Sequence, residues 1–281
     1  MLNATDDLPK SQDARLVITW IGHSTFLIQS NGVNVLTDPI WSNRASPLQF
    51  AGPRRYAPPA IRFETLPRID VVFISHDHYD HLDAGTVELI AQTFPAVKWA
   101  APLGVGDFLK QRGATNVAVR DWWEACDLGR ISAFSTPAQH FSGRYPWKRN
   151  TTLWCGWIIE LGGHRVYFAG DTALHPEFKE IARRSGPIDA AILPIGAYEP
   201  RWFMQPVHMD PEEAVLAYQA LTGNNAVSSK CVFVPSHWGT FRLTDEPLDE
   251  PPRRLRAAWR AAKLPENQLR VLQLGERFEQ V

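Results

Sequence analysis

Short apolar runs separated by turn residues occupy the first forty positions and predict β-structure. The segments 16–21, 24–29 and 33–38 are rich in β-branched and aromatic residues, and an SNG turn at 30–32 joins the last two. The run VVFIS at 71–75 is apolar throughout, which is typical of a strand buried on both faces. We therefore expect a β-meander followed by an interior strand.

The rest of the chain alternates between strand-like and helix-like segments. Further expected strands lie at 98–100, 117–119, 130–136, 154–161, 165–171, 190–195, 231–236 and 269–274. Expected helices lie near 83–94, 106–112 and 176–184, from 210 onward, and near 253–263 after a link at 245–252 that is rich in proline and acidic residues. The helix that opens at Asp210-Pro211 has an N-cap residue and a proline in its first turn.

These segments form two halves, each with strands and helices of its own. Such a pattern favours an α/β fold arranged as a four-layer αββα sandwich, because each sheet is then covered by helices on one face and by the other sheet on its other face. The length of 281 residues suggests about two domains, but no composition shift, fixed repeat or low-complexity tract divides the chain. We therefore expect a tail at 1–15 and one domain at 16–281.

Composition narrows the class of protein. The 29 basic and 30 acidic side chains give a formal charge of −1, which argues against a nucleic-acid partner. The sequence has no apolar run long enough to span a bilayer, and its first ten residues lack the features of a secretory signal, so a cytoplasmic location is expected. The three cysteines form no CxxC pair and are expected to be buried apolar residues.

The clearest chemical signal is the segment SHDHYDHLD at 75–83. Between an expected buried strand and an expected helix, it places His76, His78, Asp80 and His81 within six positions. Imidazole and carboxylate ligands together suit zinc, iron or manganese. We interpret the segment as a metal-binding loop rather than as a solvated charged loop.

Three further candidate ligands each follow an expected strand, where loops of layered α/β structures converge: His140, Asp171 and His237. For each of them, a hydrogen-bonded structural role is the alternative. The full prediction is His76, His78 and His140 for one ion, Asp80, His81 and His237 for the other, and Asp171 shared between them. Two Zn²⁺ ions are the default occupants, although iron, manganese and nickel suit the same side chains.

Longer motifs connect the sequence to a known family. The segment 76–83 with His140, GDT at 170–172 and SHWGTF at 236–241 resembles the metallo-β-lactamase fold superfamily. Within it, WIGHSTFLI at 20–28, LTDPIWSNRASP at 36–47, LPIGAYEPRWFM at 193–204 and HMDPEEAV at 208–215 resemble the N-acyl-phosphatidylethanolamine-hydrolysing phospholipase D family and its bacterial relatives. The similarity covers most of 16–252.

The resemblance implies an αββα fold, a dinuclear zinc centre and hydrolysis of a phosphodiester to phosphatidic acid and an N-acylethanolamine. It also places His208 near the metals as an extra hydrogen-bond donor, with a histidine bonded to helix backbone as the alternative. The catalytic residues on this hypothesis are Asp80, Asp171 and His208. A lactone or ester hydrolase of the same fold and a non-catalytic scaffold that binds metal or lipid remain the alternatives.

Several residues outside the ligand set are candidates for contact with substrate. Aromatic residues in the irregular segment 39–68 and beside YEPRW would hold acyl chains, and arginines in the same segment would meet a phosphate. The candidates are Trp41, Phe50, Tyr56, Trp202 and Phe203 for the chains and Arg44, Arg54 and Arg55 for the phosphate. His23 is expected to orient a ligand, with a packing role as the alternative.

The expected partner is a phospholipid or another small amphiphile. Contact with a membrane surface is left open, with the basic helix near 253–263 as one candidate for it. If the chain associates with itself, a dimer is the expected assembly.

Overall fold

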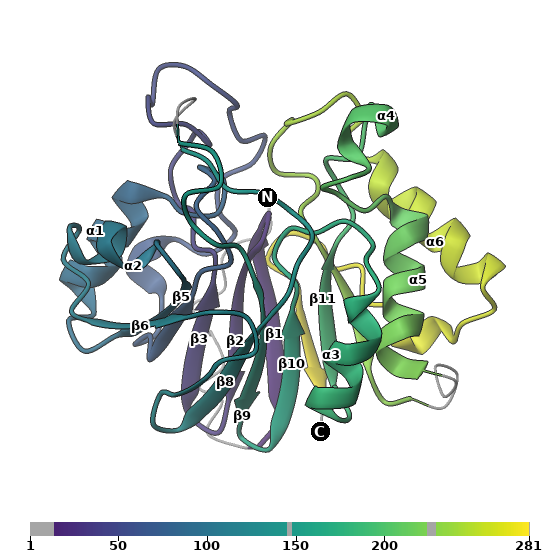
Figure 1. The fold of residues 1–281 in the computed structure, drawn as a ribbon, viewed down its shortest axis with the longest axis horizontal. Helices are drawn as coiled ribbons and strands as arrows, with labels where there is room; N and C mark the ends of the chain where they lie inside the picture. Colours follow the sequence, from purple (N-terminus) through teal and green to yellow (C-terminus); the bar gives the residue numbers. More distant parts are fainter. Residues whose placement is uncertain (1–13, 145–147, 224–228, 281) are drawn as a thin grey trace.

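Two sheets lie face to face at the centre of the molecule (Figure 1). The computed structural model describes residues 14–144, 148–223 and 229–280, so most of the tail expected at 1–15 lies outside the described residues. The first sheet has the order β13-β1-β2-β3-β4-β5-β6. Its strands are β1 (Leu16–Gly22), β2 (Thr25–Ser30), β3 (Val33–Thr37), β4 (Val71–Phe73), β5 (Lys98–Pro102), β6 (Asn116–Arg120) and β13 (Arg277–Gln280).

The second sheet has the order β12-β11-β10-β9-β8-β7. Its strands are β7 (Ala125–Asp127), β8 (Ile131–Thr136), β9 (Gly156–Leu161), β10 (His164–Phe168), β11 (Ala190–Pro194) and β12 (Val232–Ser236). The helices are α1 (Ala84–Thr93), α2 (Gly106–Lys110), α3 (Glu177–Ser185), α4 (Arg201–Met204), α5 (Pro211–Thr222) and α6 (Glu250–Ala261), with short 3₁₀ turns at Phe63–Thr65 and Glu266–Gln268. Helices α1 and α2 lie outside the first sheet and α3, α5 and α6 outside the second, which confirms the four-layer αββα sandwich (Figure 1).

Three apolar clusters fill the three spaces between these layers. Phe26, Phe73 and Trp157 are fully buried between the sheets. The neighbouring residues on the same strands point the other way, because successive side chains of a strand alternate between its faces. Leu27 therefore packs toward α1 and α2, and Ile158 packs toward the helices of the second sheet. Burial on both faces explains why the strands are apolar at nearly every position.

Strand direction determines where the loops meet. Strands β3 to β6 are parallel to one another, and so are β10 to β12. Strand β1 runs in the same direction as β3 because both are antiparallel to β2, and β8 matches β10 because both are antiparallel to β9. The carboxyl ends of these nine strands, β1, β3 to β6, β8 and β10 to β12, are consequently gathered at the upper edge of the sandwich in Figure 1. Loops that are far apart in sequence meet there.

The strand predicted at 269–274 is wrong. Leu269 makes one isolated bridge to Phe233 and packs in the cluster under α5 and α6, whereas Leu272 packs between the sheets. The alternating apolar pattern reflects a chain that crosses the end of the sandwich and contributes to two cores in turn. The last strand is β13, which pairs with β1 after a turn at Gly275.

Smaller differences concern element boundaries and single side chains. Helix α6 begins at Glu250, inside the predicted link, because a proline in the first turn of a helix has no hydrogen bond to lose. The short elements β7 and α4 were not predicted. Trp154, the first residue of the strand expected at 154–161, lies before β9 and is only half-buried, whereas the three cysteines are buried as expected. Among the described residues, none of the helices combines the length and the apolar character that crossing a bilayer requires.

The N-cap of α5 makes a testable contribution to stability. The Asp210 carboxylate accepts a hydrogen bond from the Glu213 N–H, and the Glu213 carboxylate accepts one from the Asp210 N–H. Asp210→Ala should lower the free energy of unfolding by about 1 kcal/mol, measured by urea denaturation. Asp249 caps α6 without a side-chain cap bond, so Asp249→Ala is the matched control. Equal effects of the two substitutions would contradict the capping role.

Candidate metal centre

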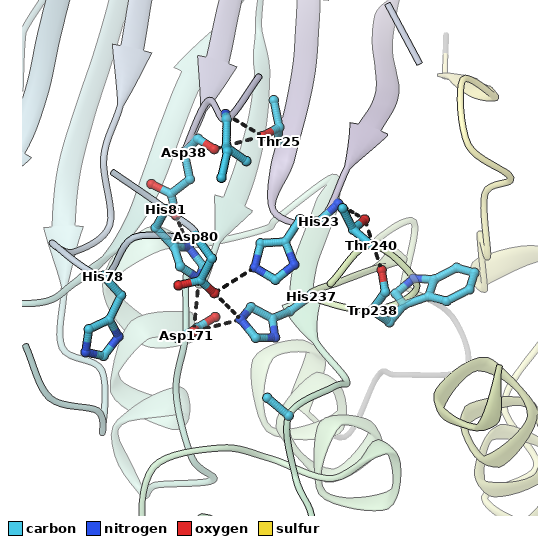
Figure 2. A network of polar contacts seen from close by, with 12 residues as sticks. His23, Thr25, Asp38, His78, Asp80, His81, Asp171, His237, Trp238 and Thr240 are labelled. Atoms are coloured by element: carbon cyan, nitrogen blue, oxygen red, sulfur yellow. Dashed lines mark hydrogen bonds and ion pairs between the residues drawn. The ribbon is translucent and has the colours of Figure 1, made fainter. Parts of the chain in front are cut away.

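The predicted ligands come from loops that follow four different strands. His76, His78, Asp80 and His81 follow β4, and His140 follows β8. Asp171 comes three residues after the end of β10, and His237 comes directly after β12. The structure brings all seven together at the edge where the strand ends converge, and Figure 2 shows His81, Asp171 and His237 around the Asp80 carboxylate, with His78 to one side.

Three histidine nitrogens form the first group of this cluster. His78 Nδ1 lies 2.9 Å from His76 Nε2 and 3.1 Å from His140 Nε2. Atoms of this kind within 4.8 Å of one another can hold a metal ion. His76 and His140 are buried, and His78 is partly exposed. The group is therefore open to solvent at one of its members.

Counting protons shows that the first group fits a cation. His140 Nδ1 donates to the Val207 carbonyl at 2.9 Å, so in a neutral ring Nε2 carries a lone pair. Ser75 Oγ donates its hydrogen to the Asp38 carboxylate and therefore accepts from His76 Nδ1. The Nε2 atom of His76 is left with a lone pair. His78 Nδ1 has at most one hydrogen, so it cannot donate to the lone pairs of both His76 Nε2 and His140 Nε2. A metal ion would accept all three lone pairs, which is the donor set zinc prefers.

The second group combines carboxylates and imidazoles. His81 Nε2 and His237 Nε2 lie 3.2 Å and 3.3 Å from Asp80 Oδ2. The same two nitrogens lie 3.1 Å and 3.0 Å from Asp171 Oδ2. Buried carboxylates need positive charge close by, and a cation held by these atoms would supply it.

Asp171 connects the two groups through one oxygen. Its Oδ2 is 3.9 Å from the Nε2 atoms of both His76 and His140, in addition to its short contacts with the second group. Its Oδ1 is buried and has no hydrogen-bond partner among the described residues. Gly170 allows this approach, since its φ is +62° and an added Cβ would lie 2.5 Å from Ser75 Cβ. One oxygen of Asp171 thus lies within 4 Å of histidine nitrogens from both groups.

The pKa values of the histidines are lowered in the first group and raised for His81 and His237 in the second. Burial lowers the pKa of His140 to about 3 and that of His78 to about 4, so the first group is uncharged at neutral pH. Burial opposes charge on His237, but the Asp171 and Asp80 carboxylates together outweigh it and raise the pKa of His237 to about 9. The imidazoles in turn hold the pKa of Asp171 well below its ordinary value in spite of burial. In the protein without metal, protons on the second group balance its carboxylates.

Asp38 is a member of the site that the sequence analysis missed. Its fully buried carboxylate accepts from His81 Nδ1 at 2.7 Å and from the Ser75 N–H, also at 2.7 Å. It therefore fixes the ring of His81 with Nε2 directed at Asp171. Asp38 follows β3 directly, so the rule that found His140, Asp171 and His237 would have found it as well.

His208 lies beside the cluster without belonging to either group of three. It is buried, its Nε2 is 3.9 Å from Asp171 Oδ2, and its ring is edge-on to that of His140. Its backbone carbonyl accepts from Arg201, which also pairs with Glu213 in the first turn of α5. The alternative of a side chain bonded to helix backbone is not what the structure shows, because His208 Nδ1 has no partner among the described residues.

The other candidates for substrate contact divide into two classes. Arg55 is buried and donates to the carbonyls of Ile40 and Ser42, and Arg44 donates to carbonyls of its own loop, so both stabilise 39–68. Arg54 is exposed. Trp41 packs against α1, whereas the remaining aromatic candidates are mostly exposed: Phe50, Tyr56, Trp202 and Phe203.

The role of Asp38 can be tested by removing its charge. In Asp38→Asn the amide holds His81 less strongly, so metal affinity should fall about 10- to 100-fold, measured by titration of chelator-treated protein. Asp77→Asn is the matched control, because this buried carboxylate in the same loop accepts from the Gly143 N–H rather than from a histidine ring. Unchanged affinity in Asp38→Asn would refute the positioning of His81.

Comparison with known proteins agrees with this geometry. The model of the beta-lactamase superfamily domain matches residues 33–238. An uncharacterised protein of Mycobacterium tuberculosis is 43% identical over 257 residues, which cover 91% of this chain and 67% of that protein. N-acyl-phosphatidylethanolamine-hydrolysing phospholipase D 1 of Caenorhabditis elegans is 38% identical, with 95% and 76% covered.

Among solved structures, a metallo hydrolase from the archaeon Ignicoccus hospitalis superposes with a TM-score of 0.67 at 24% identity, covering 95% of this chain and 99% of the other. At this identity the likeness concerns the fold. The match to the family model spans most of the chain and includes every predicted ligand. The chain therefore belongs to the beta-lactamase superfamily and is a metal-dependent hydrolase of that fold.

Proposed function

We propose that the protein is a dinuclear, zinc-dependent phosphodiesterase of phospholipase D type that cleaves N-acyl-phosphatidylethanolamine or a related amphiphilic phosphodiester. The observation that carries the proposal is the position of Asp171 Oδ2, in contact with histidine nitrogens of both groups. A single ion would leave either the lone pairs of the first group or the carboxylates of the second group without a cation.

The roles of the protein side chains follow from their positions. His76, His78 and His140 would hold one ion, Asp80, His81 and His237 would hold the other, and Asp171 would bind both. The chemistry that two ions would supply at these residues is activation of a water molecule and positive charge beside the phosphoryl oxygens.

His208 is the candidate donor to the substrate. Burial holds the pKa of this imidazole well below its ordinary value, so the ring is neutral at neutral pH. A neutral imidazole with its hydrogen on Nε2, 3.9 Å from Asp171 Oδ2, would donate to a phosphoryl oxygen that gains charge during the reaction. Arg201 keeps the His208 backbone in place through its bond to the carbonyl.

Exposed aromatic side chains support an amphiphilic substrate. Trp202 and Phe203 on α4 are 81% and 62% exposed, and Phe50 and Tyr56 in segment 39–68 are 81% and 62% exposed. Figure 1 shows α4 and this segment at the end of the sandwich where the strand ends converge. Large apolar surface that flanks a polar site suits a substrate with a charged head and acyl chains. The named activity of the relative from Caenorhabditis elegans agrees with such a substrate.

The proposal is tested first at the shared carboxylate. Asp171→Asn should lower turnover of N-acyl-phosphatidylethanolamine by more than about 100-fold, the upper end of the losses seen when an outer partner of a metal ligand is removed. Removal of metal from the wild type by chelation should abolish turnover, and two equivalents of Zn²⁺ should restore it. Turnover and bound metal are measured on the same samples.

The matched control is Asp189→Asn, which alters a carboxylate that accepts from the Arg165 N–H at the opposite end of β10. It should retain wild-type turnover and metal content. Full activity in Asp171→Asn would contradict the dinuclear site. Turnover of a lactone but of no phosphodiester would keep the metal centre and reject the phosphodiesterase.

The aromatic side chains on α4 give a separate test of the substrate class. Trp202→Ser and Phe203→Ser should each weaken binding to phospholipid vesicles about 10- to 100-fold, because burial of a large apolar side chain contributes about 1.5–3 kcal/mol. Turnover of vesicle substrate should fall more than that of a short soluble diester. Leu216→Ser, on the exposed face of α5, is the control. Equal losses on both substrates would count against acyl-chain contact by α4.

A further inference from the structure

The backbone of His23 has a left-handed conformation, which usually favours glycine. It lies in the turn between β1 and β2 with a left-handed φ of 54°, a conformation that is costly for residues other than glycine and persists where contacts enforce it. Its N–H donates to Thr240 Oγ1 at 2.7 Å. Its carbonyl accepts from Trp20 Nε1 at 3.0 Å and from the His237 N–H at 3.2 Å. The side chain is thereby held at a fixed place beside the metal centre.

The imidazole of His23 contacts one carboxylate. Its Nε2 lies 2.9 Å from Asp80 Oδ2, and because an ionised carboxylate only accepts, Nε2 is the donor. The side chain is 1% exposed. Its ring centroid lies 4.1 Å from that of His237, and its ring is edge-on to that of Phe241. Figure 2 shows His23 above His237, with its contact directed at Asp80.

This geometry separates His23 from the candidate ligands around it. His81 and His237 each contact Asp80 and Asp171, whereas the ion-pair contact of His23 among the described residues is with Asp80. His23 therefore lies against Asp80 on a side that does not reach the shared carboxylate. A ring nitrogen of His23 also lies within 4.8 Å of the ligand atoms of His81 and His237, so binding to an ion is the alternative to a role in orienting Asp80.

We propose that His23 is a positioning residue that holds the Asp80 carboxylate in the orientation needed at the second metal position. The inference rests on the dinuclear site of the proposed function. His23, His81 and His237 all contact Asp80 Oδ2. If the Nε2 atoms of His81 and His237 bind an ion, His23 is the one of the three that can still donate a hydrogen bond to Asp80. Outer donors of this kind typically change metal affinity by 10- to 100-fold when they are removed.

The test compares two substitutions that differ in the donor. His23→Phe keeps a ring for packing against His237 and removes the hydrogen bond, whereas His23→Gln keeps an N–H donor of similar reach. Co²⁺ is titrated into chelator-treated protein and followed by visible absorption and calorimetry. Wild type should bind two equivalents, and His23→Phe should lose about 10- to 100-fold in affinity for the second equivalent alone. His23→Gln should stay within a few fold of wild type.

The matched control is His175→Gln. His175 is another buried histidine, it stacks on Phe178 with ring centroids 4.3 Å apart, and it belongs to none of the candidate metal groups among the described residues. Its substitution should leave both binding steps unchanged. If circular dichroism shows that His23→Phe does not fold, His23→Leu removes the donor with a smaller side chain and is interpreted in the same way.

The remaining outcomes overturn the proposal in distinguishable ways. Wild-type affinity for both equivalents in His23→Phe would show that the hydrogen bond to Asp80 is dispensable. Loss of the second equivalent in both His23→Phe and His23→Gln would make the imidazole itself a ligand. Equal weakening of both steps would indicate a general structural role. One equivalent in the wild type would reject the dinuclear site itself, independently of the variants.

Discussion

The buried carboxylate of Asp171 is the constraint on which the rest of the site depends. One of its oxygens contacts nitrogens from both histidine groups, and the other has no hydrogen-bond partner among the described residues. A carboxylate placed in this way is stable only with positive charge beside it. In the protein without metal, protons on His81 and His237 supply that charge, and divalent ions would replace them.

The fold serves this arrangement by gathering strand ends at one edge. Each sheet sends the carboxyl ends of several strands to the same place, so side chains far apart in sequence meet there. Close approach is possible because Gly170 has no side chain to collide with Ser75. A second layer of partners then fixes the ligand rings, with Asp38 on His81 and the Val207 carbonyl on His140. Rigid ligands of this kind bind metal without the cost of being ordered first.

The sequence predicts this site well because its signals are local or follow one rule. The HxHxDH segment is contiguous, and His140, Asp171 and His237 were found because each follows an expected strand. Asp38 satisfies the same rule but was not proposed, since a single aspartate has no clustered histidines to mark it. His23 was expected to orient a ligand, but its partner Asp80 could not be named, because the hydrogen bond joins residues 57 positions apart and no local pattern encodes such a contact.

The strand expected at 269–274 failed for a related reason. Its alternating apolar residues satisfy the pattern of a half-buried strand, but the two sides of the segment enter different cores at the end of the sandwich. Periodicity reports which side chains are buried and not what buries them. The four layers were predictable because continuous apolar strands require cover on both faces.

The central claim is that two metal ions share Asp171, and anomalous scattering from crystals of the purified protein tests it most directly. Data collected on either side of the zinc absorption edge should give two peaks that flank Asp171 Oδ2. One peak should lie among His76, His78 and His140, and the other among Asp80, His81 and His237. A single peak, or two peaks away from Asp171, would contradict the account.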